Sequence, residues 1–321
     1  MGKRIILAII LLSLATAGFA QKPKKKTKTK KAAPQGVAVL WREPTDIESR
    51  DLFNGPGGES MKPDLSRVTF IRDQAGGGYS INYRVRDGAG KIWVAKLRDE
   101  AQPETAAVRL VWAVGYMTEI NYLVPCVKIE GAPQHSSVKR CEGNGFANVK
   151  FEARPKKVRR LEIWHWANNV FSGTKEFQAM IVLMSLINNW DLKDDNNKII
   201  FVPDGPGGPE LRYILSDLGA TFGKTGGFMS RSRNKPEDFV KSRFVEGVEG
   251  NRVRFSYSGK NSTLLSNITV EQAKWIGSWL SRLSDRQISD AFRAANYTPE
   301  EVQMLTGAVR ARINQLLALR D

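Results

Sequence analysis

The sequence predicts an α+β fold of two lobes, in which an antiparallel sheet with one helix precedes a mainly helical region. Two observations support this division. Residues 66–155 contain short stretches rich in β-branched and aromatic residues, separated by turn signals and one apolar helical stretch. Residues 156–321 contain a strongly apolar segment and three helix-start patterns. The chain has 321 residues, enough for one large two-lobed domain.

The first lobe is expected to contain five strands and one helix. The third strand returns from a hairpin turn at Asp87–Gly90, and a glycine turn at Gly76–Gly78 precedes the second. The helix carries Pro103 and Glu104 in its first turn and continues to Tyr116. The predicted strands cover residues 67–71, 79–85, 92–97, 122–129 and 148–152.

The second lobe is expected to be built around a buried helix. Residues 177–187 are apolar nearly all round, as in a helix at the centre of a lobe. Two strands follow, at 198–202 and 211–215, with a Pro/Gly turn at 204–209 between them. Near the C-terminus, capping-box patterns begin at Thr269, Ser284 and Thr298, and each predicts the start of a helix.

The N-terminus has the pattern of a secretory signal peptide over residues 1–20. A basic start is followed by about ten apolar residues and then by small residues up to Ala20. This run is too short to span a bilayer, which takes about twenty residues, so we expect no transmembrane segment in the mature chain. The mature protein is expected to begin at Gln21 and to be exported, either to the periplasm or into the medium.

A lysine-rich stretch follows, and we expect residues 21–37 to form a disordered linker. Residues 22–31 hold seven lysines and no apolar side chain. The net charge of +16 falls to +7 when these seven lysines and the two basic residues of the signal peptide are removed. The linker therefore suggests attraction to an anionic surface, with a solvated spacer as the alternative. No nucleic-acid module is recognisable, so no nucleic-acid partner is expected. Residues 38–65 are expected to be a loop-rich segment.

The two cysteines, Cys126 and Cys141, are predicted to form a disulfide. An even pair behind a signal peptide favours a bond, whereas a cytosolic chain would favour two buried thiols. The chain has only two histidines and two cysteines, which excludes an ordinary zinc site built from these residue types.

Two polar motifs mark the candidate site. The first is Asn189-Trp190-Asp191-Leu192-Lys193-Asp194-Asp195-Asn196, directly after the buried helix. The second is Ser216-Asp217-Leu218-Gly219, at the end of a predicted strand. An Asp with an Asn five positions later, followed by a strand that ends in Asp-Leu-Gly, resembles the phosphoryl-transfer site of the protein-kinase-like superfamily. The chain is most similar to divergent branches of that superfamily: HipA-type kinases, secretory-pathway kinases and type II phosphatidylinositol 4-kinases.

This resemblance implies two binding roles in the first lobe. Lys96, in Val-Ala-Lys-Leu at the end of a strand, matches the lysine that contacts the α- and β-phosphates. Glu104, on the apolar face of the next helix, is expected to pair with Lys96. Glu100 is the alternative partner, although it precedes the predicted helix start.

The resemblance also assigns roles in the second lobe, with ATP and Mg²⁺ as the implied cofactors. Asp191 would orient the acceptor and take its proton, and Lys193 would neutralise charge on the γ-phosphate. Asn196, or Asn197 beside it, would supply a metal oxygen, and Asp217 would be the principal Mg²⁺ ligand. The acidic residues Asp194 and Asp195 are either assisting ligands or exposed loop acids.

The sequence also departs from ordinary kinases. Asn189-Trp190 replaces the His-Arg that usually precedes the catalytic Asp, and Gly76–Gly78 lacks the spaced glycine pattern. No Ala-Pro-Glu follows Asp217. A basic segment at 224–260 occupies the position of an activation loop, where it would either select an acidic substrate or form an ordinary basic surface. Trp164-His165-Trp166 would either line an adenine pocket or pack in the core.

Three functions are consistent with these observations. The first is an exported, metal-dependent phosphotransferase with an unknown acceptor, against which stands the scarcity of ATP outside the bacterial cytoplasm. The second is a catalytically silent kinase-like binding domain at the cell envelope. The third is an adhesion or wall-associated module in which the motif match is accidental. The third predicts that Lys96, Asp191 and Asp217 do not converge.

Overall fold

A computed structural model describes residues 33–74, 80–227 and 229–320 of the chain. The predicted signal peptide, most of the lysine-rich linker and the Gly76–Gly78 turn lie outside these described residues. Residues from Gln35 onward form one compact unit, which is the part considered below.

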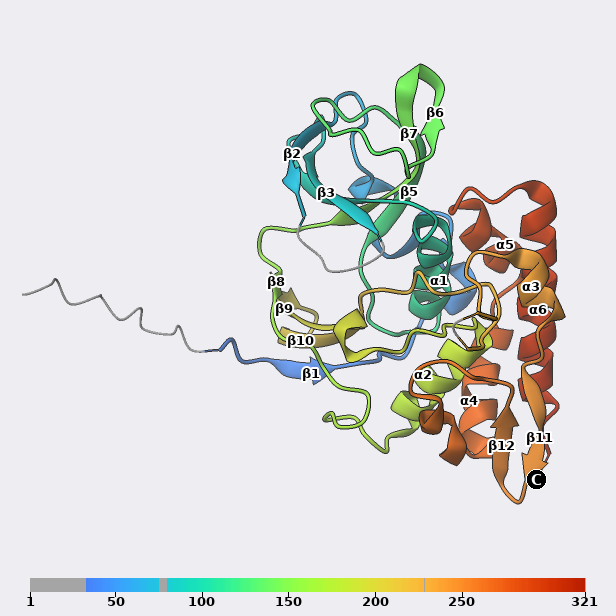
Figure 1. Ribbon diagram of the computed structural model, residues 1–321. Coiled ribbons are helices and arrows are strands. Elements are labelled where there is room, and N and C mark those ends of the chain that lie inside the picture. The colour runs from blue at the N-terminus through green and yellow to red at the C-terminus, as the bar shows by residue number, and fades with distance from the viewer. Residues whose placement is uncertain (1–32, 75–79, 228, 321) are drawn as a thin grey trace, which may run out of the picture. The chain divides into compact units, whose positions relative to one another are not determined.

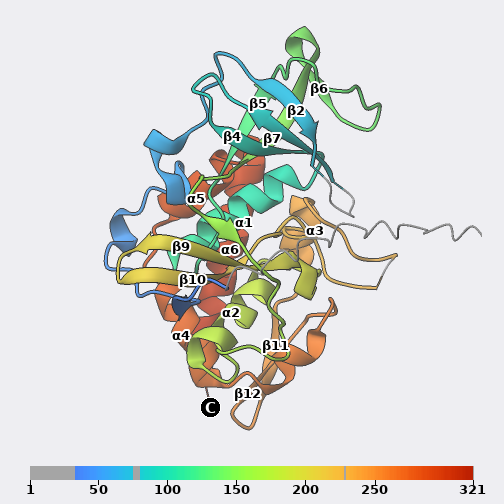
Figure 2. The ribbon, with the colours of Figure 1, turned by 90° about the vertical axis from the view of Figure 1, so that its left-hand side faces the viewer.

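The first lobe is an antiparallel sheet with one helix (Figures 1 and 2). The strand order β2-β3-β4-β7-β5 places sequence-distant β7 next to β4, and the short β6 pairs with β7. The strands are β2 (Thr69–Asp73), β3 (Ile81–Arg86), β4 (Ile92–Leu97), β5 (Asn121–Val127), β6 (Arg140–Cys141) and β7 (Gly145–Ala153). Helix α1 (Ala101–Ala113) connects β4 to β5 and contacts β5 and β7.

Side chains alternate between the two faces of this sheet. On β4, Trp93, Ala95 and Leu97 belong to an apolar cluster with Tyr83 and Phe151. We call this the apolar face. The intervening residues, including Lys96, point to the opposite side, which we call the charged face.

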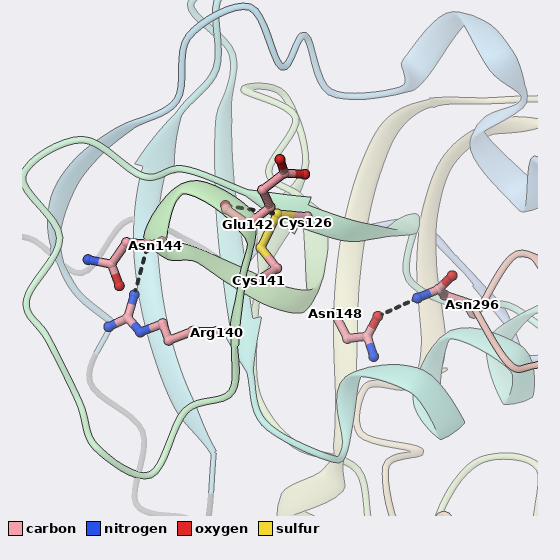
Figure 3. The surroundings of a disulfide bond; sticks show 7 residues. All are labelled: Cys126, Arg140, Cys141, Glu142, Asn144, Asn148 and Asn296. Carbon is pink, nitrogen blue, oxygen red and sulfur yellow. Dashed lines mark hydrogen bonds between the residues drawn. A yellow bond between two sulfur atoms is a disulfide. The ribbon is translucent and has the colours of Figure 1, made fainter.

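A disulfide joins β5 to β6, as predicted (Figure 3). The Cα atoms of Cys126 and Cys141 lie 5.8 Å apart, within the range that a disulfide spans. Near it, Asn296 Nδ2 donates a hydrogen bond of 2.7 Å to Asn148 Oδ1 (Figure 3). This contact connects the sheet to the loop before the last helix.

The second lobe is mainly helical. Helix α2 (Lys175–Leu186) is central, and most of its side chains are buried. It packs against α4 (Val270–Ser281), and α6 (Pro299–Leu317) packs against both α4 and α5 (Asp285–Arg293). The three predicted capping boxes, at Thr269, Ser284 and Thr298, are confirmed at the starts of α4, α5 and α6.

Strands also occur in and around the second lobe. The predicted pair is β9 (Asn197–Gly205) and β10 (Gly208–Leu215), whose turn is tighter than expected because Gly208 adopts a φ of 103°. They form a sheet with β1 (Val37–Val39), which is parallel to β10, and with β8 (Arg159–Arg160). The hairpin β11 (Val245–Glu249) and β12 (Arg252–Phe255) lies in the basic segment, after the short helix α3 (Pro236–Lys241).

The predicted α+β class is confirmed, with an antiparallel sheet and one helix followed by a mainly helical region. Residues 38–65 contain three 3₁₀ turns, at Ile47–Ser49, Gly55–Gly57 and Glu59–Met61. Within the described part of the chain, no helix has the length and apolarity needed to span a membrane.

Candidate active site

Lys96 occupies the centre of the candidate site. It lies near the end of β4, and its side chain is only 8% exposed. Its Nζ atom is 2.7 Å from Glu104 Oε2 and 3.2 Å from Asp217 Oδ1. Asp217 lies 121 residues further along the chain, so the fold brings together the predicted phosphate-binding lysine and the predicted metal ligand.

Glu104 is held by two lysines. It lies in the first turn of α1, and its side chain is buried. Its second carboxylate oxygen accepts a hydrogen bond from Lys150 Nζ, and Lys150 is also 3.0 Å from Glu152 Oε2. Lys150 and Glu152 lie on β7, within a predicted strand, but were not predicted to belong to the site. Their alternation with the apolar residues Val149 and Phe151 was the available signal, because it places them on the charged face.

Glu100, the alternative partner, also contacts Lys96. It occupies the cap position before α1, and its Oε2 atom is 3.4 Å from Lys96 Nζ. Glu100 is also bound by Ser80 and by Arg233 of the basic segment. Glu104 is therefore the closer partner of Lys96, and Glu100 links the site to the basic segment.

The ion pair between Lys96 and Asp217 keeps both groups charged. Burial would lower the pKa of Lys96, but the negative charges of Glu104 and Asp217 outweigh it and raise that pKa. Burial would likewise raise the pKa of Asp217, but the positive charge of Lys96 outweighs it and holds that pKa below its ordinary value. The site therefore presents an ionised carboxylate at neutral pH, and the Asp217 side chain is 39% exposed.

The loop after α2 is hydrogen-bonded to the segment after β10 that carries Asp217. Asn196 Nδ2 donates a hydrogen bond of 2.7 Å to the Asp191 backbone oxygen. The backbone oxygen of Asn196 accepts hydrogen bonds from the Ser216 amide at 2.8 Å and from the Asp217 amide at 3.2 Å. Among the described residues, the side-chain hydrogen bonds of Asn196 all use Nδ2, which leaves Oδ1 available as a metal ligand. Asp191, Asn196 and Asp217 thus belong to one hydrogen-bonded unit.

Asp191 is mostly buried and lies between two cations. Its Oδ2 atom is 2.8 Å from Lys193 Nζ, and its Oδ1 atom is 3.9 Å from Lys260 Nζ. Among the described residues, Oδ1 has no hydrogen-bond donor although it is shielded from solvent. An under-satisfied carboxylate oxygen of this kind is suited to accept a proton from a bound hydroxyl group.

The remaining candidates are structural. Asn197 is fully buried and its Nδ2 atom donates to the Trp164 backbone oxygen at 3.2 Å. Because no part of its side chain reaches the surface, Asn196 and not Asn197 is the available ligand. Asp194 accepts hydrogen bonds of 2.9 Å from the Trp166 amide and from the His165 ring, which fastens a neighbouring loop. Asp195 is exposed. Trp164 and Trp166 pack in the core, as the core alternative predicted.

The metal-binding capacity of the site is small. Asp217 and Asn196 offer hard oxygen atoms, which suit Mg²⁺. Across the described residues, no group of three or more His, Cys, Asp or Glu side chains could hold a metal ion.

The basic segment lies against the candidate site. The Arg231 guanidinium is 4.1 Å from the centre of the Trp190 ring, and that of Arg233 is 5.0 Å away. Trp190 directly precedes Asp191, and the Lys260 amide donates to the Trp190 carbonyl at 2.9 Å. Residues 231–260 therefore place positive charge around the predicted acceptor position.

No protein-family model matches the chain, and no curated protein matches it. Among solved structures, it is similar to the Helicobacter pylori proinflammatory kinase CtkA, with 10% identity, a TM-score of 0.47, and coverage of 80% of this chain and 97% of that one. It is also similar to the Golgi casein kinase, with 11% identity, a TM-score of 0.32, and coverage of 83% and 77%. A Golgi casein kinase structure with Mn/ADP bound shows 11% identity, a TM-score of 0.30, and coverage of 78% and 74%.

Proposed function

We propose that the chain is an exported, metal-dependent, kinase-like phosphotransferase that uses a nucleoside triphosphate. The observation that carries this proposal is the contact of Lys96 Nζ with both Glu104 and Asp217, at 2.7 and 3.2 Å. The fold gathers these three residues and connects Asp217 through Asn196 to Asp191. An accidental motif match gives no reason for such convergence.

Each side chain has a distinct role in this proposal. Lys96, held in place by Glu104, binds phosphate oxygens, and Asp217 and Asn196 hold Mg²⁺. When bound, magnesium and the triphosphate supply the phosphoryl group and neutralise its charge. Lys150 donates a hydrogen bond to the second carboxylate oxygen of Glu104, which fixes the orientation of Glu104 toward Lys96.

Asp191 orients the acceptor hydroxyl and accepts its proton at Oδ1, the oxygen without a donor among the described residues. Lys193, on the other oxygen, orients the carboxylate and contributes positive charge toward the transferred group. With Lys260 also near Asp191, an acidic acceptor is favoured over a basic one. The acceptor could belong to a protein, lipid, sugar or small molecule.

Export is part of the proposal. The Cys126–Cys141 disulfide is consistent with an oxidising compartment, and residues 1–20 have the signal-peptide pattern. Residues 21–37 would then hold the protein near an anionic surface.

One observation favours the alternative, a catalytically silent kinase-like domain at the cell envelope. Lys96 is paired directly with Asp217, so the phosphate-binding cation and the metal-binding carboxylate neutralise each other. In that case the same residues would bind a ligand without transferring a phosphoryl group.

The test is a comparison of binding and turnover in the full mature chain. Nucleotide binding is measured by thermal shift with ATP and Mg²⁺, and turnover by release or transfer of radioactive γ-phosphate. Asp191→Ala is expected to bind nucleotide like the parent and to lose turnover by about 10²- to 10⁴-fold. The matched control is Asp195→Ala, which removes an exposed carboxylate from the same loop and should keep both activities.

Three outcomes separate the candidate functions. Loss of turnover in Asp191→Ala alone supports the phosphotransferase. Binding by the parent without turnover on any acceptor supports the silent domain. If the parent does not bind nucleotide, or if the parent turns over and Asp191→Ala retains that turnover as Asp195→Ala does, the kinase-like assignment is wrong.

A further inference from the structure

A second site lies outside the phosphoryl-transfer residues. A cavity of about 490 Å³ opens between the first lobe, the loop after α1, the segment 153–160 and the β9–β10 pair. Lys96, Asp191, Asn196 and Asp217 do not line it. Its lining includes six arginines, and we call it the arginine hollow: Arg42, Arg50, Arg84, Arg154, Arg160 and Arg212.

Two of these arginines are positioned by one buried carboxylate. Glu210 on β10 is only 3% exposed. Its Oε1 atom is 2.6 Å from Arg42 Nη2, and its Oε2 atom is 2.7 Å from Arg212 Nε. A guanidinium carries five N–H donors, so each arginine keeps donors beyond those that Glu210 accepts.

A second carboxylate pair positions two more. Arg160 is hydrogen-bonded to buried Glu119, and Arg154 forms an ion pair with Glu152. Arg154 Nη1 is also 4.0 Å from Glu119 Oε2. These contacts hold the guanidiniums in place before any ligand arrives, which lowers the entropic cost of binding.

The other two arginines leave a surplus of positive charge. Arg50 pairs with Asp46 at 2.8 Å and donates to the Trp112 carbonyl at 2.6 Å. Arg84 on β3 lies opposite Val94 in the sheet and makes no ion pair with another described residue. Among the described residues, the six guanidiniums are thus matched by four carboxylates, those of Asp46, Glu119, Glu152 and Glu210.

The hollow also has apolar walls, formed in part by Ile92, Trp112 and Ile200. Its volume lies in the range of small-molecule pockets, about 300–1,000 Å³. We propose that the arginine hollow binds a small organic molecule that carries at least two anionic groups, phosphates or carboxylates, on an apolar frame. Planar guanidiniums match both kinds of group with paired hydrogen bonds.

The proposal is tested by calorimetric titration of the full mature chain at constant ionic strength. The probes are citrate and inorganic pyrophosphate, with acetate as the singly charged reference. Citrate or pyrophosphate is expected to bind at one site at least about tenfold more tightly than acetate. Arg84→Gln is expected to weaken that binding about tenfold or more, since a hydrogen bond to a charged group contributes about 1.5–3 kcal/mol.

The matched control is Arg72→Gln. Arg72 lies opposite Arg84 on β2, is exposed and does not line the hollow, so this change should alter binding less than about twofold. Arg212→Gln provides a second lining variant, and circular dichroism checks that each variant is folded. If Arg72→Gln and Arg84→Gln weaken probe binding equally, the probes are attracted non-specifically to a basic chain, and the proposal is overturned. The absence of saturable probe binding to the parent would also overturn it.

A crossed comparison separates this site from the phosphotransferase. Asp217→Ala should leave probe binding unchanged, and Arg84→Gln should leave Mg²⁺-dependent ATP binding unchanged. If the probes bind with these properties while ATP does not bind at all, the proposal for the arginine hollow is supported and the proposal of a phosphotransferase is refuted. If Asp217→Ala abolishes probe binding, the hollow is part of the nucleotide site and the separate site is refuted.

Discussion

The two faces of the first-lobe sheet differ although they are built from the same strands. The apolar face packs Tyr83, Trp93 and Phe151 into one cluster. The charged face presents Lys96, Lys150 and Glu152, which alternate with apolar residues along β4 and β7. Alternation with a period of two is sufficient to place one set on each side.

The two faces contribute differently to the free energy of unfolding. Burial of apolar surface on the first face stabilises the lobe. Buried ion pairs on the second face gain little net stability, because desolvation offsets their attraction. Well-packed apolar residues could fill such positions at no loss of stability, so stability alone does not account for the charged face. The predictions below test that difference, from the largest expected effect to the smallest.

Phe151→Ala is expected to have the largest effect on stability. Phe151 is fully buried, and its ring centre lies 6.1 Å from that of Trp93. The substitution should lower the free energy of unfolding by about 3–5 kcal/mol, measured by urea denaturation. Nucleotide binding should persist wherever the variant is folded. A folded Phe151→Ala that binds no nucleotide would contradict the separation of the two faces.

Loss of the disulfide is expected to have the next largest effect. Cys126 and Cys141 are separated by 15 residues, and closing a loop of that size stabilises by about 3 kcal/mol in the chain-entropy model. The double variant Cys126→Ser/Cys141→Ser should unfold at correspondingly lower urea. The unreduced parent, once unfolded, should expose no reactive thiol. Two labelled thiols in that sample would show that the bond is absent.

Glu119 should make stability depend on pH. Burial and the nearby charge of Glu152 outweigh Arg160 and Arg154 and raise its pKa from 4.5 to about 7. Its contribution is therefore fully present below pH 4.5 and is lost as pH rises through 7.

The corresponding variant is Glu119→Gln, which cannot ionise. Relative to this variant, the parent should lose up to about 3 kcal/mol of unfolding free energy between those pH values. Urea denaturation at several pH values measures the difference. Parallel curves for the two proteins would show that Glu119 does not titrate in this window.

Much of the fold could be predicted from local sequence. The bounds of β4 were predicted residue for residue, because alternation and a hairpin turn mark both of its ends. The capping boxes gave the starts of α4, α5 and α6, since that pattern depends on neighbouring residues alone. The strands β1 and β8 were missed, because they have three and two residues and form only by pairing with distant β10 and β9.

The candidate site could be predicted only in part. Motif spacing pointed to Lys96, Glu104 and Asp217, but it did not distinguish Asn196 from Asn197. That choice depends on which side chain faces the Trp164 carbonyl in the folded protein. Lys150 and the arginine hollow depend on contacts between segments far apart in the chain, so local patterns carried no sign of their partners.

The central proposal is that Asp217 would hold the metal ion of a metal–nucleotide complex. Its most direct test is titration of ATP into the full mature chain with and without Mg²⁺, for the parent and for Asp217→Asn, with Asp195→Asn as the control. We predict that Mg²⁺ strengthens ATP binding to the parent and to the control by at least about tenfold, and that Asp217→Asn loses this enhancement. Equal enhancement in all three proteins, or none in the parent, would contradict the account.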